Sequence, residues 1–135
     1  IDRIIDGIHT QEGLAIAAHP VPTRKVEPQT FHLWHHRDRL SFKMDAWEVA
    51  SGSHLFDEVF ESGLPMVASS DLHHPSQMSS WKTVLDGKRE IKSVFKAIRS
   101  QDLNFTYLEN PSPWRQAPKK TVPNHFWFGF NFSKA

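Results

Sequence analysis

The chain has 135 residues and contains no cysteine. This absence excludes a disulfide framework and a thiolate zinc site, and it is compatible with a reducing compartment. No apolar run approaches the ~20 residues that are needed to cross a bilayer. The formal net charge of +1 does not favour a nucleic-acid surface, which requires clustered Lys and Arg. We therefore expect a cytoplasmic protein that contacts neither nucleic acid nor membrane.

A carboxylate and an imidazole follow the apolar run at residues 65–68. Asp71 and His73 are two residues apart, and in an extended segment such side chains point to the same face. An oxygen ligand combined with a nitrogen ligand suits zinc, manganese or iron better than calcium. The sequence therefore predicts a metal-binding pair at the end of a strand.

A second candidate ligand lies upstream, where the apolar run at residues 14–18 leads into His19 and Pro20. A single His after an apolar strand is more often a hydrogen-bonded structural residue than a ligand. Because both the His and the Asp-x-His motif follow apolar runs, we expect two strands to converge on one ion.

Three motifs occur in order along the chain. They are Gly-Leu-Ala-Ile-Ala-Ala-His-Pro at 13–20, Asp-Ala-Trp-Glu-Val-Ala at 45–50 and Ala-Ser-Ser-Asp-Leu-His at 68–73. Over residues 1–108 the chain resembles the C-terminal half of the polymerase and histidinol phosphatase (PHP) family of metal-dependent phosphoesterases.

The resemblance implies an α/β fold, the C-terminal part of a distorted (β/α)7 barrel, followed by a C-terminal extension. It also implies that His19, Asp71 and His73 are metal ligands, because the family has a His-Pro strand end and a late Asp-x-His motif. The implied cofactors are divalent Zn, Mn or Fe ions, up to three in the intact site. The implied substrate is a phosphorylated small molecule.

The chain departs from the family in its early motifs. The family begins with His-x-His and adds further His and Glu ligands, whereas this sequence offers only Gly7-Ile8-His9-Thr10. His9 falls in a segment that we expect to be a helix, so it is predicted to be a helix-surface residue. A barrel also needs ~200 residues or more. We expect a missing N-terminal half or a companion chain to supply the other ligands.

Strands and helices are expected to alternate along the chain. The near-continuous apolarity of residues 14–18 is typical of a strand in a parallel sheet. Ser53 is expected to cap one of the helices. The expected helices cover 2–11, 29–40, 54–61 and 90–100, and the expected strands cover 14–18, 44–50, a segment leading to Asp71, and 104–108.

Residues 1–108 are expected to form the C-terminal half of a PHP domain, and 109–135 a Pro-containing linker with an aromatic extension. Four phenylalanines alternate with other residues in that extension: Phe126, Phe128, Phe130 and Phe132. This period of two predicts a strand with one aromatic face. We expect it to pack on the barrel or on a partner rather than to form a mobile tail.

Glu48 is expected to point among small residues of its strand. It is interpreted as a residue that orients a ligand His, the alternative being a carboxylate hydrogen-bonded to nearby backbone or to His54. His32 and His36 are four residues apart, the spacing of a two-His metal site, but a solvated or capping role is favoured because no acidic residue completes a zinc-protease motif.

The sequence identifies no catalytic side chain. Arg24 and Lys82 are candidates for binding the substrate phosphate, with solvated surface charges as the alternative. The favoured function is a metal-dependent phosphoesterase in the intact protein, with the isolated chain inactive. The alternatives are a degenerate PHP-like module for binding or regulation and a metal-binding protein without hydrolysis.

Overall fold

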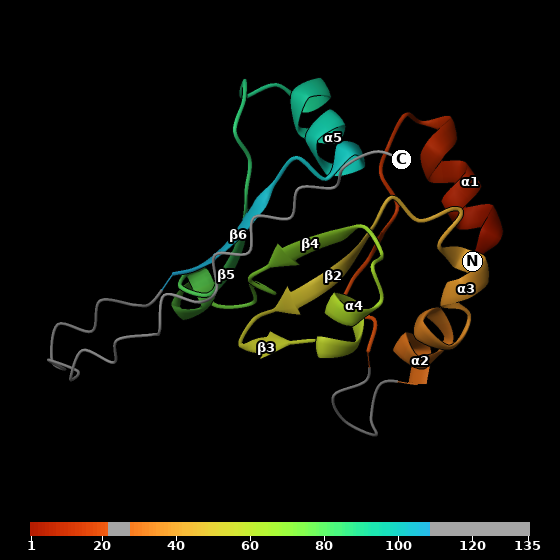
Figure 1. Cartoon of the computed structure of the whole chain (residues 1–135), viewed down its shortest axis with the longest axis horizontal. Coiled ribbons are helices and arrows are strands. Elements are labelled where there is room, and N and C mark those ends of the chain that lie inside the picture. Colours follow the sequence, from red (N-terminus) through yellow and green to blue (C-terminus); the bar gives the residue numbers. More distant parts are fainter. Residues whose placement is uncertain (22–27, 109–135) are drawn as a thin grey trace, which may run out of the picture.

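A computed structural model of the chain describes residues 1–21 and 28–108. It has a mixed α/β architecture in which helices and short strands alternate (Figure 1). The elements in chain order are α1 (Asp2–Thr10), β1 (Ile16–Ala17), α2 (Pro28–His35), α3 (Arg37–Leu40), β2 (Ala46–Ser51), β3 (His54–Leu55), α4 (Asp57–Glu61), β4 (Met66–Ser69), η1 (Pro75–Met78), β5 (Trp81–Val84), α5 (Ile91–Ser100) and β6 (Asn104–Tyr107).

Three parallel strands form the centre of the molecule. Strand β2 pairs with β1 on one side and with β4 on the other. All six residues of β2 are buried, so both of its faces are covered, as is usual for parallel sheets. The expected parallel sheet is thus confirmed, although β1 is shorter than the predicted strand.

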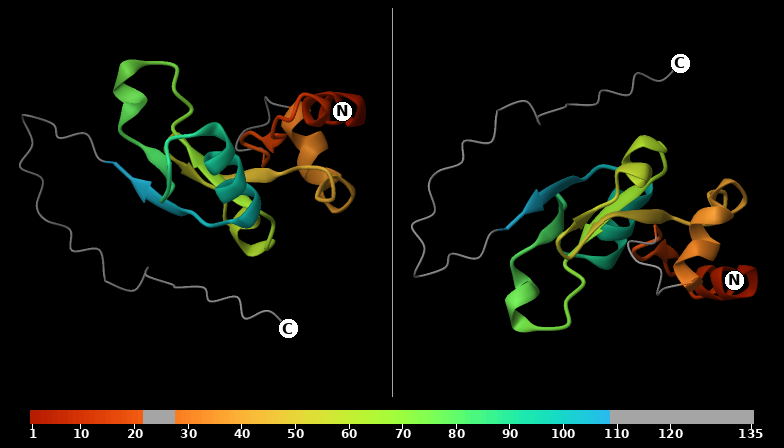
Figure 2. Two further views of the ribbon diagram at one scale, coloured as in Figure 1. Left: turned by 90° about the horizontal axis from the view of Figure 1, so that it is seen from above. Right: turned by 90° about the horizontal axis from the view of Figure 1, so that it is seen from below.

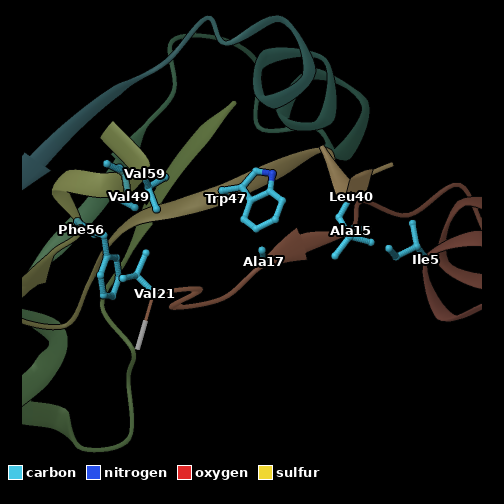
Figure 3. Packing of buried hydrophobic residues seen from close by; sticks show 11 residues of the cluster. Ile5, Ala15, Ala17, Val21, Leu40, Trp47, Val49, Phe56 and Val59 are labelled. Carbon is cyan, nitrogen blue, oxygen red and sulfur yellow. The ribbon is translucent and has the colours of Figure 1, made fainter. Parts of the chain in front are cut away.

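The main hydrophobic core lies on the face of β2 that carries Trp47 and Val49 (Figure 3). Trp47 is fully buried and packs with Ala17 of β1 and Leu40 of α3. A smaller cluster joins Ala46 of β2, Val67 of β4 and Ile98 of α5. Helix α5 therefore packs on a different set of strand residues from α1, α3 and α4.

Strands β5 and β6 form a separate antiparallel pair. This pair lies toward the end of the molecule opposite to α1, α2 and α3 (Figure 2). It joins the main sheet through a side chain, because the Thr83 hydroxyl donates to the carbonyl oxygen of Ala68 and accepts from the nitrogen of Ala68, both at 2.8 Å. One threonine thus replaces a backbone ladder between β4 and β5.

The predicted helices at 2–11 and 90–100 and the strand at 104–108 are confirmed to within one residue at each end. The predicted helix at 29–40 is divided, since α2 ends at His35 and α3 begins at Arg37. The division falls at His36, whose ring nitrogen Nδ1 donates to the carbonyl oxygen of His32. That bond caps a carbonyl in the last turn of α2.

The prediction of a helix at 54–61 capped by Ser53 is wrong at its amino end. Residues 54–55 form β3, which pairs with Ala50 and Ser51 of β2 in an antiparallel hairpin. Gly52 has a φ of 60°, a conformation that suits a two-residue hairpin loop. Helix α4 therefore starts only at Asp57, with Phe56 in the N-cap position.

Neither sheet closes into a barrel within the described residues, so the barrel fragment stays a prediction. None of the helices in residues 1–21 and 28–108 combines the length and apolar character that crossing a membrane requires. Arg24 and the expected extension at 109–135, with its four phenylalanines, lie outside the described residues.

Candidate functional site

The predicted ligands lie at one edge of the main sheet. Because β1, β2 and β4 are parallel, their carboxyl ends meet at the same edge, which is where open α/β sheets bind ligands. His19 follows the end of β1 by two residues, and Asp71 follows the end of β4 by two residues. The sheet topology thus brings together two turns that are about fifty positions apart in sequence.

Both turns have an unusual backbone. Four non-glycine residues among those described have positive φ angles, and two of them, Glu12 and Gln101, occur where helices end. The other two are His19, with a φ of 28°, and Asp71, with a φ of 49°. Such conformations persist only where the surroundings fix them, and they concentrate at functional sites.

Asp71 and His73 are close together, but not for the reason that the sequence suggested. Strand β4 ends at Ser69, and the left-handed conformation of Asp71 removes the alternation of an extended chain. The turn itself brings the groups together, since His73 Nδ1 lies 2.9 Å from the carbonyl oxygen of Asp71 and 3.5 Å from its Oδ1.

This contact defines which nitrogen of His73 is able to bind a metal. A carbonyl oxygen only accepts hydrogen bonds, so Nδ1 must carry the proton. In the neutral ring the lone pair is then on Nε2. The side chain of His73 is 69% exposed and that of Asp71 is 42% exposed, so an ion from solvent has access to both.

The segment after Asp71 is ordered by Gln77, a residue that the sequence analysis missed. Its side-chain oxygen accepts hydrogen bonds from the backbone nitrogens of His73 at 2.7 Å and His74 at 2.6 Å. Gln77 is the third residue of η1, which begins at Pro75. A Gln at this position after a Pro at the first position is the helix-start signal that would have identified it.

Glu48 connects the two turns. It is 6% exposed, and its Oε2 accepts a hydrogen bond from the backbone nitrogen of His19 at 2.5 Å. Its Oε1 accepts a hydrogen bond from the hydroxyl of Ser69. The same hydroxyl oxygen accepts a bond from the backbone nitrogen of Asp71 at 3.3 Å. The alternative prediction was that Glu48 is hydrogen-bonded to nearby backbone or to His54. The bond to backbone is present, at His19. His54 is exposed, and the described hydrogen bonds of Glu48 are to His19 and Ser69 instead.

Two carboxyl groups, those of Glu48 and Asp71, belong to this end of the sheet. Among the described residues, the ion pairs of Lys and Arg do not include Glu48 or Asp71. A carboxylate that is buried without a cation is costly. Of the two, only Glu48 is buried, and its two oxygens accept hydrogen bonds from His19 and Ser69.

Of the two predicted phosphate-binding residues, the structure describes Lys82 but not Arg24. Lys82 is half-buried on β5, where its Nζ donates to the carbonyl oxygen of Trp81 at 3.1 Å and lies 3.4 Å from the Ser80 hydroxyl. Arg24 lies outside the described residues. Their role in binding phosphate stays a prediction.

The three predicted ligands do not form one cluster within the described part of the chain. No group of three or more His, Cys, Asp or Glu side chains there is spaced to hold a metal ion. The structure brings Asp71 and His73 into contact and places His19 on the turn after β1, with β2 between that strand and β4. A complete site would need further ligands or a movement of these turns.

Four further histidines, His9, His32, His35 and His36, have structural contacts. The rings of His32 and His36 lie 4.2 Å apart between centroids, and those of His35 and His36 lie 5.0 Å apart. The bond from His36 to the end of α2 agrees with the predicted capping role. His9 lies on the surface of α1, as expected, and its Nε2 is 2.9 Å from Oδ2 of Asp45.

One cavity among the described residues is separate from this site. It measures about 850 Å³ and lies between the end of α1 and α5, with Glu12, Phe95 and Lys96 in its walls. Arg99, which also lines it, pairs with Asp45 just before β2. The cavity is therefore at the amino end of the sheet, opposite to the predicted ligands.

No protein-family model matches the chain, and no curated protein matches it either. The resemblance to the PHP family therefore depends on the three sequence motifs.

Proposed function

We propose that this chain is the C-terminal part of a PHP-type metal-dependent phosphoesterase. The observation that most supports the proposal is the meeting of two turns at the carboxyl edge of the parallel sheet. One turn carries His19 and the other carries Asp71 and His73. Glu48 is hydrogen-bonded to the first turn directly and to the second through Ser69.

In this proposal, His19, Asp71 and His73 hold divalent zinc, manganese or iron. When bound, such an ion lowers the pKa of a coordinated water toward ~7 and neutralises charge on the phosphoryl oxygens of the substrate. Asp71 contributes a carboxylate, and His73 contributes the lone pair on Nε2. Glu48 adds negative charge from within the sheet, and Lys82 and Arg24 are the proposed contacts of the substrate phosphate.

The remaining ligands are proposed to come from a missing N-terminal half or from a companion chain. Three side chains cannot complete a cluster of up to three ions. The isolated chain should therefore bind metal weakly and should hydrolyse a generic phosphate ester little in the presence of Mn²⁺ or Zn²⁺. Robust turnover that is lost in His73→Ala would contradict this half-site model, because it would mean that the chain builds a sufficient site alone.

Metal binding is the direct test of the proposal. Calorimetric titration with Zn²⁺ and with Mn²⁺ should show that His73→Ala and Asp71→Asn each lower the affinity by at least about tenfold. His54→Ala is the control, since His54 is an exposed histidine that is not a proposed ligand. Equal affinities in all four proteins would refute the metal site and would favour a non-catalytic binding module.

A further inference from the structure

We propose that Ser69 is a positioning residue that couples the conformation of the His19 turn to that of the Asp71 turn. Its use in metal binding rests on the proposed function, whereas the coupling of the two turns is a property of the fold. Ser69 is the last residue of β4. It lies between Glu48 and Asp71 in an unbroken series of hydrogen bonds from one turn to the other.

The position requires a hydroxyl group. The hydroxyl hydrogen of Ser69 is donated to Oε1 of Glu48, and the oxygen of the same group accepts from the nitrogen of Asp71. A hydroxyl is able to do both at once, because it has one donor and two lone pairs. Alanine would leave Oε1 of Glu48 without a donor among the described residues.

The loss of the Ser69 hydroxyl would also affect His19, which follows a different strand, β1. Glu48 is 6% exposed, and its described hydrogen bonds are those to His19 and Ser69. A buried carboxylate that loses one of two donors must move toward water or another donor. Either movement would loosen the bond from Oε2 to the nitrogen of His19.

The backbone of both turns depends on this series of bonds. His19 and Asp71 have positive φ angles, which other residue types than glycine adopt at a cost. Glu48 binds the amide of His19 and Ser69 binds the amide of Asp71. The backbone at two predicted ligands is thus held by bonds that converge on one hydroxyl.

The first experiment needs no metal. Amide hydrogen exchange by NMR should show that Ser69→Ala increases the exchange rate of the His19 amide about tenfold, as expected for the loss of one hydrogen bond. Ser69→Thr, which keeps the hydroxyl, should restore the protection. Ser70→Ala is the matched control. An unchanged His19 amide in Ser69→Ala would overturn the coupling.

The second experiment measures Zn²⁺ affinity in a double-mutant cycle of Ser69→Ala and His19→Ala. Ser69→Ala should lower the affinity by about 10- to 100-fold in the wild-type background, and much less when His19 is already absent, because the hydroxyl acts partly through His19. Strictly additive effects would overturn positioning through His19.

The two experiments separate the two proposals. If Zn²⁺ binding does not depend on His73, the proposed function fails, while the His19 amide still decides whether Ser69 couples the turns. If binding depends on His73 but neither the amide nor the affinity responds to Ser69→Ala, the positioning role alone is wrong. Unfolding midpoints of all variants, measured in urea, separate a local effect from global unfolding.

Discussion

Asp45, directly before β2, and Arg99, in the last turn of α5, form an ion pair in which Nε lies 3.2 Å from Oδ1. The other carboxylate oxygen of Asp45 accepts a hydrogen bond from the backbone nitrogen of Ala15 at 2.8 Å and lies 2.9 Å from His9 Nε2. One side chain thus connects α1, the start of β1, β2 and α5 at the amino edge of the sheet.

This arrangement predicts a pH-dependent stability. Burial raises the pKa of Asp45, but the bonds from Ala15, His9 and Arg99 outweigh it, so the pKa is lowered overall. A carboxyl group whose pKa is lower in the folded than in the unfolded state stabilises the fold above its unfolded pKa of ~3.9. That contribution is lost as the pH falls from about 4 through the folded pKa.

Asp45→Asn should therefore be less stable than the wild type at pH 6.5, by about 1–3 kcal/mol for bonds to a charged group. The difference should shrink as the pH falls below about 4. Urea unfolding of both proteins between pH 2.5 and 7 checks this. A difference that is constant over the whole range would show that the charge of Asp45 does not contribute.

Thr83 is predicted to hold the β5–β6 pair on the main sheet. In Thr83→Val the nitrogen and the carbonyl oxygen of Ala68 both lose their bond to the hydroxyl, and each unpaired buried group costs about 1–3 kcal/mol. Thr83→Ser keeps the hydroxyl and should cost less than Thr83→Val. Thermal unfolding of the three proteins decides, and an equally stable Val variant would refute this role.

Gly7 and Gly13 should respond in opposite ways to the same substitution. Gly7 lies inside α1 with nothing within 4 Å of an added Cβ, so Gly7→Ala should stabilise the protein by up to about 1 kcal/mol through helix propensity. A Cβ at Gly13 would lie 2.9 Å from Cγ2 of Ile8 and 3.1 Å from its carbonyl oxygen. Gly13→Ala should therefore cost about 1–3 kcal/mol.

Urea unfolding at neutral pH measures both changes on one scale. A stabilising Gly13→Ala would mean that the turn after α1 relaxes without loss, which would contradict the close approach of Gly13 to Ile8. A destabilising Gly7→Ala would contradict the open space beside Gly7.

Trp47 is predicted to dominate the core. It is fully buried and contacts Trp34 edge to face, with ring centroids 6.2 Å apart. Trp47→Ala should cost about 3–5 kcal/mol. Trp47→Phe should cost clearly less than Trp47→Ala, because it keeps an aromatic ring in the core and loses only an Nε1 that has no hydrogen-bond partner among the described residues.

Phe42→Ala is the control for Trp47. Phe42 is 91% exposed, and its truncation should change the free energy of unfolding by no more than about 0.5 kcal/mol. If Trp47→Ala were as mild as Phe42→Ala, the cluster around β2 would not be the stabilising core.

Periodicity in the sequence was sufficient for the elements with a strong local pattern. Ile5 and Ile8 predict α1, and Val94 and Ile98 predict α5, because residues three or four apart share one face of a helix. The near-continuous apolar run before His19 correctly predicted a parallel strand. The two helices each bury one stripe of apolar residues, and such a stripe has a period that can be recognised in the sequence.

Other features depend on contacts between distant residues. The hairpin at Gly52 replaced the start of an expected helix because residues 54–55 pair with Ala50 and Ser51. The division between α2 and α3 at His36 was not expected either. Each of these outcomes is decided by pairing and packing that override the local helical preference.

The candidate site divides in the same way. The sequence alone identified the candidate ligands, since Asp71, His73 and His19 each follow an apolar run that forms a strand, and it also placed Glu48 in a strand. Only the tertiary structure decided that His19 and Asp71 have left-handed backbones and that Ser69 links both turns to Glu48. The physical reason is that hydrogen bonds between strands join residues that have no fixed separation in the sequence. No local sequence pattern therefore predicts them.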